Sequence, residues 1–346
     1  MEWRPRHPPY AAPLDGGPVP GNDSESPRSP DELAPIPSPQ ARPQVLAPIP
    51  SPQARPQGVA TLPPPEAGPE GLGSEFVKPG PRPGQCSPMA ESRATATNLA
   101  GARAAWAEAP EVMDFLDPAS PVHDLKVLER ALYLEQWASL VPPGGRVLDL
   151  GGGIGRFATW CLDRGCTVEL VDADARSLEA AARHGAAHGD RLRLHHSRAE
   201  ALPPIEPVDV VIACELLCYV DDPALVLRRA REVLRPGGVL LASVEAHYGW
   251  AMAVDAPAGF VDVVLGNGVL AVPGDRFVRT YTRDTFRDLL AGWQVEKMVM
   301  SHFVLSGPFE VVAGEVDLPR LLDLESRFRA HPVLGELGRA IVAVAR

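Results

Sequence analysis

Four glycines crowd into five positions directly after an apolar run near the middle of the chain. The segment reads VLDLGGGIGRFA and covers residues 147–158, with glycine at 151, 152, 153 and 155. Glycine destabilises strand and helix interiors, because the unfolded chain has more conformational freedom to lose. The cluster therefore indicates that the backbone itself approaches something closely, and we predict a ligand-binding loop.

Two ligand classes fit a glycine-rich turn of this kind. The dinucleotide pattern G-x-G-x-x-G places a pyrophosphate at a helix N-terminus, but its third glycine would fall at Arg156. The spacing is instead D-x-G-x-G-x-G, formed by Asp149, Gly151, Gly153 and Gly155. This pattern favours S-adenosylmethionine, which has no phosphate and ends in an amino acid. Glycines let the backbone approach that end closely, and carboxylates can bind its ammonium group or the ligand's hydroxyls.

Alternating strands and helices are predicted to position this loop. Parallel strands joined by helices form an open α/β sheet with helices on both faces, and such sheets bind ligands at the carboxyl ends of their strands. The glycine loop follows the first predicted strand and so lies at that edge. We predict strands at 146–150, 167–174, 191–199, 208–217 and 239–245, and helices at 155–165, 175–189 and 223–238.

The motifs together resemble the class I S-adenosylmethionine-dependent methyltransferases, and especially the small-molecule group typified by quinone-biosynthesis enzymes. The resemblance covers about residues 125–346 and rests on VLDLGGGIGR, VELVDAD, REVLRPGG, YTRDTFRDLLAGWQVEKMVM and RAIVAVAR. It implies a Rossmann-like, doubly wound α/β sheet of seven strands, mostly parallel with the last strand antiparallel. It also implies methyl transfer by in-line displacement, with S-adenosylmethionine as the cofactor.

The resemblance assigns cofactor contacts residue by residue. Asp172 takes the role of the acid that grips the ribose hydroxyls, while Asp174 is expected to cap the next helix. The third-strand motif departs from the family, because Arg198 stands where an acid is usual, so the adenine edge falls to Ala199 and Glu200. The predicted cofactor-binding residues are Asp149, Gly151, Gly153, Gly155, Asp172, Ala199, Glu200 and Cys214.

Few residues can serve as a general base for the acceptor. His247 and Tyr248 directly follow the fifth strand, and Glu215 ends the fourth, so these three form the predicted catalytic set. A surface histidine at 247 and a structural Glu215 are the alternatives. His302 is expected to be a satisfied core residue, His195 and His196 to face opposite ways, and His184 and His188 to share an exposed helix face, with no metal site. The NPPY-type motif is absent, which argues against nucleobase or glutamine amide nitrogens as acceptors.

The chain divides by composition into three parts. Residues 1–88 hold 24 of the 39 prolines and repeat LAPIPSPQARPQ at 33–44 and 46–57, so we expect a disordered tail. That tail either has no specific role or docks on a partner, and translation starting at Met89 is a further possibility. Residues 89–143 are expected to form a helical cap and 144–346 the methyltransferase domain. Aromatic residues of the cap, Trp106, Phe115 and Trp137, and the apolar insertion at 246–280 could together close an apolar acceptor pocket. Ordinary packing is the alternative, and it is the favoured interpretation for Trp137.

Net charge and composition indicate which classes of binding partner are expected. The net charge is −11, which argues against a nucleic-acid partner, since phosphate contacts supply most non-specific affinity. Five cysteines without metal-ligand spacing and no membrane-length apolar run favour a cytoplasmic enzyme with no membrane partner and a small-molecule acceptor. A nicotinamide dehydrogenase, a protein methyltransferase and a non-catalytic binding protein remain as alternatives.

Overall fold

The computed structural model describes residues 88–252, 265, 268–272, 276–305 and 317–346. Residues 1–87 of the predicted tail and the middle of the 246–280 insertion lie outside the described residues. Among the described helices, none has the length and apolarity required to cross a membrane.

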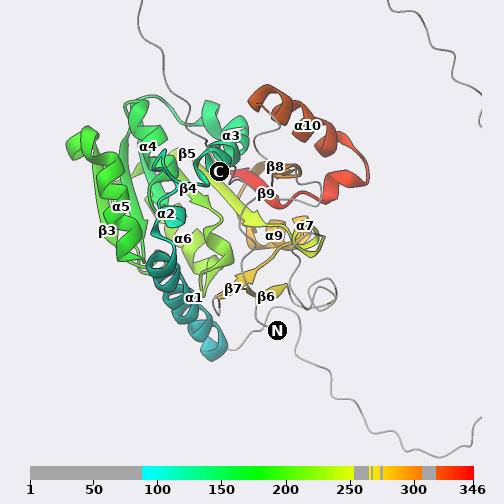
Figure 1. Cartoon of the computed structure of the whole chain (residues 1–346), viewed down its shortest axis with the longest axis horizontal. Coiled ribbons are helices and arrows are strands. Elements are labelled where there is room, and N and C mark those ends of the chain that lie inside the picture. The colour runs from blue at the N-terminus through cyan, green and yellow to red at the C-terminus, as the bar shows by residue number, and fades with distance from the viewer. Residues whose placement is uncertain (1–87, 253–264, 266–267, 273–275, 306–316) are drawn as a thin grey trace, which may run out of the picture. The chain divides into compact units, whose positions relative to one another are not determined.

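A seven-stranded sheet forms the centre of the described fold, in the order β3-β2-β1-β4-β5-β9-β8 (Figure 1). Strand β9 is antiparallel to both of its neighbours, while the pairs among β1 to β5 are parallel. This confirms the predicted doubly wound sheet with an antiparallel closing strand. The strands are β1 (Arg146–Leu150), β2 (Thr167–Asp172), β3 (Leu192–His196), β4 (Val208–Cys214), β5 (Leu234–Glu245), β8 (Val295–Ser301) and β9 (Ala340–Ala345).

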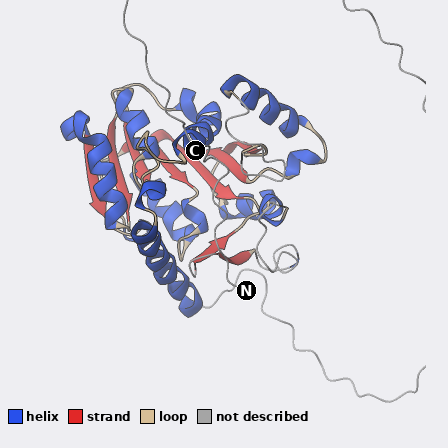
Figure 2. Ribbon diagram, viewed as in Figure 1, coloured by secondary structure: helices blue, strands red, loops and turns tan. Residues whose placement is uncertain are grey.

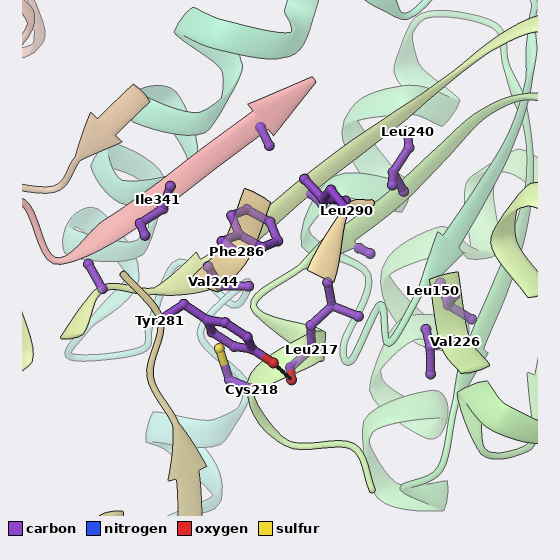
Figure 3. Packing of buried hydrophobic residues seen from close by; sticks show 14 of the residues in the cluster. Leu150, Leu217, Cys218, Val226, Leu240, Val244, Tyr281, Phe286, Leu290 and Ile341 are labelled. Carbon is purple, nitrogen blue, oxygen red and sulfur yellow. Dashed lines mark hydrogen bonds between the residues drawn. The ribbon is translucent and has the colours of Figure 1, made fainter. Parts of the chain in front are cut away.

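Helices cover both faces of the sheet (Figure 2). Strand β1 shows why both faces need cover, because successive side chains of a strand point to opposite faces of the sheet. Its neighbours Val147 and Leu148 belong to different buried clusters, one on each face. The Leu148 cluster packs α6 (Pro223–Val233) and α9 (Arg283–Leu289), and Figure 3 shows Val226 and Phe286 within it. The Val147 cluster packs α4 (Arg156–Asp163) and α5 (Ala175–Gly185).

Several predicted boundaries need correction. The predicted 223–238 helix ends at Val233, and β5 already begins at Leu234, so its Pro-Gly-Gly segment lies within a strand. Gly237 has a φ of 80°, and the pairing of β4 with β5 shifts register there, which accommodates the proline. The predicted strand at 208–217 stops at Cys214, because Glu215 adopts the left-handed conformation with a φ of 57°. Asp174 caps α5 as predicted, by accepting from the Ser177 amide at 3.1 Å.

Within the part of the chain that the structure describes, three α-helices precede the sheet: α1 (Pro88–Glu108), α2 (Pro110–Met113) and α3 (His123–Trp137). These helices match the helical cap predicted for residues 89–143. The domain boundary between this cap and residues 144–346 stays a prediction. Trp137 is 1% exposed and stacks on Tyr133, which makes it a packing residue. The insertion contributes α7 (His247–Ala251) and a two-stranded sheet of β6 (Val269–Val272) and β7 (Arg276–Arg279), and α10 (Leu318–Ala330) follows β8.

Candidate active site

A cavity of about 420 Å³ opens at the carboxyl ends of β1, β2 and β4, where the sequence predicted the ligand. Its floor is the glycine loop and its walls come from α1, α3 and the segments after β3 and β4. The predicted cofactor residues Asp149, Gly151, Gly153, Asp172, Ala199, Glu200 and Cys214 all line it, while Gly155 begins α4 just below.

The glycine loop has the backbone that its sequence requires. Gly151, Gly153 and Gly155 have φ values of 71°, 56° and 89°, a region that other residues adopt at a cost. Gly152 is needed for space, since an added Cβ would lie 2.7 Å from Leu170 Cγ. At Gly153 an added Cβ would meet no atom within 4 Å, so the loop presents an open face to the cavity.

Two carboxylates hold the loop in place. Asp172 Oδ2 accepts from the Gly153 amide at 2.8 Å, and its Oδ1 accepts from the Asp174 amide at 2.8 Å. Asp149 accepts from the Ala158 amide at 3.0 Å and is 2% exposed; burial raises its pKa to about 7. Asp172 also stands in the cavity wall, so its carboxylate can bind a ligand while it orders the loop.

The segment after β3 forms another wall of the cavity. Glu200 Oε1 accepts from the Asp221 amide at 3.0 Å, and Arg198 pairs with both Glu200 and Asp221. Arg198 therefore pairs with acids on the rim, and it lines the cavity together with Ala199 and Glu200.

A charged cluster lies where α3 and the start of α4 meet the end of β4. Tyr133 on α3 donates its hydroxyl to Glu215, and Arg156 Nη2 lies 3.5 Å from Cys214 Sγ. Burial raises the pKa of Glu215, but the charge of Arg156 and the Tyr133 hydroxyl outweigh it, so the net pKa lies below its ordinary value. Burial raises the pKa of the Cys214 thiol to about 12, so it stays neutral. Glu215 is therefore a charged, weak base.

Glu129 and Lys126, one turn apart on α3, complete this cluster. Glu129 Oε2 lies 2.7 Å from Lys126 Nζ and 3.4 Å from Arg156 Nη1. Both cationic side chains line the cavity, together with Phe115. The charged cluster thus consists of Lys126, Glu129, Tyr133, Arg156 and Glu215.

His302 lies against the charged cluster but outside the cavity wall. Its ring centroid is 4.5 Å from that of Tyr133, it has a φ of 61°, and burial lowers its pKa to about 4. Within the described part of the chain neither ring nitrogen has a hydrogen-bond partner, so the expectation of a satisfied core histidine is wrong. The ring is neutral and buried among aromatic groups.

Two of the three predicted catalytic residues do not reach the cavity. His247 is 7% exposed, and its Nδ1 lies 3.0 Å from Thr280 Oγ1, which ties α7 to the end of β7. Tyr248 is 44% exposed and also lies outside the described cavity lining. Both follow the end of β5 directly, but neither is among the described residues that line the cavity. Of the predicted catalytic set, Glu215 is the member that lines it.

The remaining histidines have structural partners. His195 and His196 do face different partners, Glu169 at 2.8 Å and the Ala173 carbonyl at 3.1 Å. His184 and His188 pair with Asp114 and Asp163. Among the described residues no group of His, Cys, Asp and Glu side chains could hold a metal ion.

Sequence reasoning missed four of the charged-cluster residues. Arg156 was noted only as the place of an absent glycine, although a cation in the first turn of a helix opposes the helix dipole and so needs another partner. Lys126, Glu129 and Tyr133 sit on a helix predicted for its packing, and only the fold of α3 over the end of β4 brings them to the cavity.

Comparison with known proteins identifies the family. The profile described as a methyltransferase domain matches residues 123–296, half of the chain, and spans the glycine loop, Asp172 and Glu215. The chain belongs to this methyltransferase family. It is an S-adenosylmethionine-dependent enzyme of class I, which argues against the dehydrogenase and non-catalytic alternatives.

Two groups of relatives resemble the methyltransferase at the sequence level. The tRNA 5-carboxymethoxyuridine methyltransferase of Escherichia coli K12 is 32% identical over 218 residues, which is 60% of this chain and 82% of that protein. The ubiquinone biosynthesis O-methyltransferase of Marinobacter nauticus is 34% identical over 135 residues, or 37% of this chain, and the match spans 55% of that enzyme. Among solved structures, the 1,6-didemethyltoxoflavin-N1-methyltransferase of Burkholderia thailandensis aligns with a TM-score of 0.46 and 20% identity over 76% of this chain and 91% of that one.

The cavity residues fit S-adenosylmethionine, the cofactor of the methyltransferase. The open face at Gly153 and the buried carboxylate of Asp172 stand side by side, as a ligand with an amino-acid end and a ribose requires. We expect Asp172 to hold the ribose hydroxyls, the glycine loop to hold the amino-acid end and the Ala199 amide to meet the adenine edge. When bound, the cofactor supplies an activated methyl group.

Proposed function

We propose that the methyltransferase methylates an oxyanion, a carboxylate or an acidic phenol, on a small acceptor bound beside the charged cluster. The observation that carries this proposal is the state of Glu215. Its pKa is held below the ordinary value, and Cys214 next to it stays a neutral thiol. Neither takes a proton readily at neutral pH. The acceptor therefore has to arrive with its nucleophile already deprotonated.

Two cations of the cavity support an anionic acceptor. Lys126 and Arg156 both line the cavity, where a negative group can contact them, although Glu129 and Glu215 balance their charges. Asp149, whose pKa is about 7, is bonded to the start of α4 beneath the glycine loop, so we assign it to the cofactor side. The name of one relative, the ubiquinone biosynthesis O-methyltransferase, accords with an oxygen acceptor.

Acceptor screening with the full-length chain tests the proposal. Production of S-adenosylhomocysteine would be measured with aromatic carboxylic acids and phenols, each beside its matching amide or amine, and with bulk tRNA. We expect turnover of the acids or phenols, at a rate that changes little with pH between about 6.5 and 8.5 for carboxylates, which are already ionised there. Turnover of amines alone would contradict the oxyanion acceptor, and turnover of tRNA alone would contradict the small acceptor.

Replacing Lys126 by methionine is expected to raise the KM for the anionic acceptor about 10-fold or more, because a charge-assisted contact contributes roughly 1.5–3 kcal/mol. The affinity for S-adenosylhomocysteine should stay within about twofold, since Lys126 lies on the acceptor side. The matched control is Lys297→Met on the exposed edge of β8, which should leave both values unchanged. An equal rise in KM for a neutral acceptor analogue would contradict the role of the charge.

A further inference from the structure

Helix α1 borders the cavity and is anchored at two points, its middle and its C-terminal turn. Asn98, Leu99 and Ala102 on α1 line the cavity opposite the glycine loop. Near its C-terminal end, Trp106 is 5% exposed and donates from Nε1 to Ser177 Oγ on α5 at 3.4 Å. The helix ends at Glu108, before Ala109 and Pro110, so it is separate from α2.

The other anchor is a two-bond contact between a side chain and a strand. Asn98 Nδ2 donates to the Phe277 carbonyl at 2.9 Å, and the Phe277 amide donates to Asn98 Oδ1 at 2.6 Å. One side-chain amide thus pairs with the backbone of β7 as a neighbouring strand would. Figure 1 shows α1 with one end beside β7 and the other toward α5.

Strand β7 also touches the cavity wall. Arg279 donates from Nη1 to the carbonyl of Val220 at 3.1 Å, and Val220 lines the cavity. The Asn98 contact therefore joins α1, which borders the cavity, to a strand that borders the cavity rim. The two elements are 179 residues apart in the sequence, and the amide of Asn98 connects them directly.

We propose that Asn98 is a positioning residue that latches α1 onto β7, so that the cavity closes over the bound cofactor and opens when this contact breaks. The Asn98 bonds lie at the exposed surface, where water can replace them, whereas the Trp106 bond is buried. Release therefore occurs at Asn98 in the middle of the helix, and α1 swings about its C-terminal turn at Trp106. The proposal rests on cofactor binding in this cavity and not on the acceptor class.

The chemistry of the latch makes it testable by substitution. The asparagine side chain offers a donor and an acceptor in a single plane, whereas an aspartate at this position would keep only acceptors and a leucine would keep neither. The test measures dissociation of S-adenosylhomocysteine by stopped flow from full-length wild type, Asn98→Asp and Asn98→Leu. Two lost surface hydrogen bonds should speed dissociation by roughly 5- to 150-fold. Arg103→Ala, an exposed position on the same helix, should not change the rate.

Rates within about twofold of wild type for both Asn98 variants would overturn the latch. Failure of the wild type to bind S-adenosylhomocysteine would instead overturn the cofactor site, so the two failures are distinguishable. A second test uses the wild type alone and compares the hydrogen-exchange rate of the Phe277 amide with and without S-adenosylhomocysteine. The latch requires slower exchange when S-adenosylhomocysteine is bound, and equal exchange with and without it would contradict the proposal.

Discussion

Replacing Asp172 by alanine is expected to weaken binding of S-adenosylhomocysteine about 100-fold. The carboxylate lines the cavity and would form charge-assisted bonds with the ribose, each contributing roughly 1.5–3 kcal/mol. The same carboxylate accepts hydrogen bonds from the Gly153 and Asp174 amides, so its removal also takes away the contacts that order the glycine loop. Calorimetric titration of the full-length chain measures the effect.

Asp172→Asn and a surface carboxylate supply the controls. Asparagine keeps one oxygen acceptor but loses the charge, so we expect an affinity between those of the wild type and the alanine variant. Glu179→Ala on the exposed side of α5 removes a carboxylate without touching the cavity and should bind normally. Wild-type affinity in Asp172→Ala would show that the ribose lies elsewhere.

Replacing Arg156 by methionine is expected to lower the free energy of unfolding by about 3–5 kcal/mol, because Glu215 and Glu129 lose the cation buried beside them. Methyl transfer to the acceptor should fall at least about 100-fold, since Arg156 lines the acceptor end of the cavity. Chemical denaturation and initial rates measure the two effects.

The loss of stability in Arg156→Met should depend on pH with a defined sign. In the wild type the folded-state pKa of Glu215 is lowered, so its stabilising contribution is present above the unfolded pKa and is lost as pH falls. Without the cation, burial dominates and the pKa of Glu215 rises above that of the unfolded chain. The difference between wild type and variant should therefore increase as pH rises from about 5 to 8.

The double variant Arg156→Met/Glu215→Gln separates stability from function. Neutralising both partners removes the unpaired buried carboxylate, so we expect stability to recover by most of the loss in the single variant. Activity should stay low, because the acceptor side still lacks one of its two cations. Recovery of both would mean that Arg156 serves only to balance the charge of Glu215.

The fold could be predicted largely because local patterns decide it. The strand at 146–150 carries Val147, Leu148 and Leu150 and is buried on both faces, and Asp174 precedes its helix as a cap residue should. The glycine loop was predicted from spacing alone, since positive φ values and the lack of room at Gly152 tolerate few other residues. The cofactor side of the cavity is thus encoded within short segments.

The acceptor side depends on contacts between distant segments, which no short pattern reveals. Tyr133 meets Glu215 from 82 positions away, and Asn98 meets Phe277 from 179 positions away. His247 shows the converse case, because nearness in sequence to the end of β5 does not bring its side chain into the described cavity lining. Its Nδ1 lies 3.0 Å from Thr280 Oγ1 instead.

A crystal structure of the full-length chain with S-adenosylhomocysteine is the most direct test of the central claim, that the cofactor and acceptor share this cavity in a defined order. We predict ribose hydroxyls on Asp172, the amino-acid end over the Gly151–Gly155 loop, and the sulfur facing the space between Lys126, Arg156 and Glu215. A ligand bound outside the cavity, or a sulfur that faces away from the charged cluster, would contradict the assignment of the acceptor site.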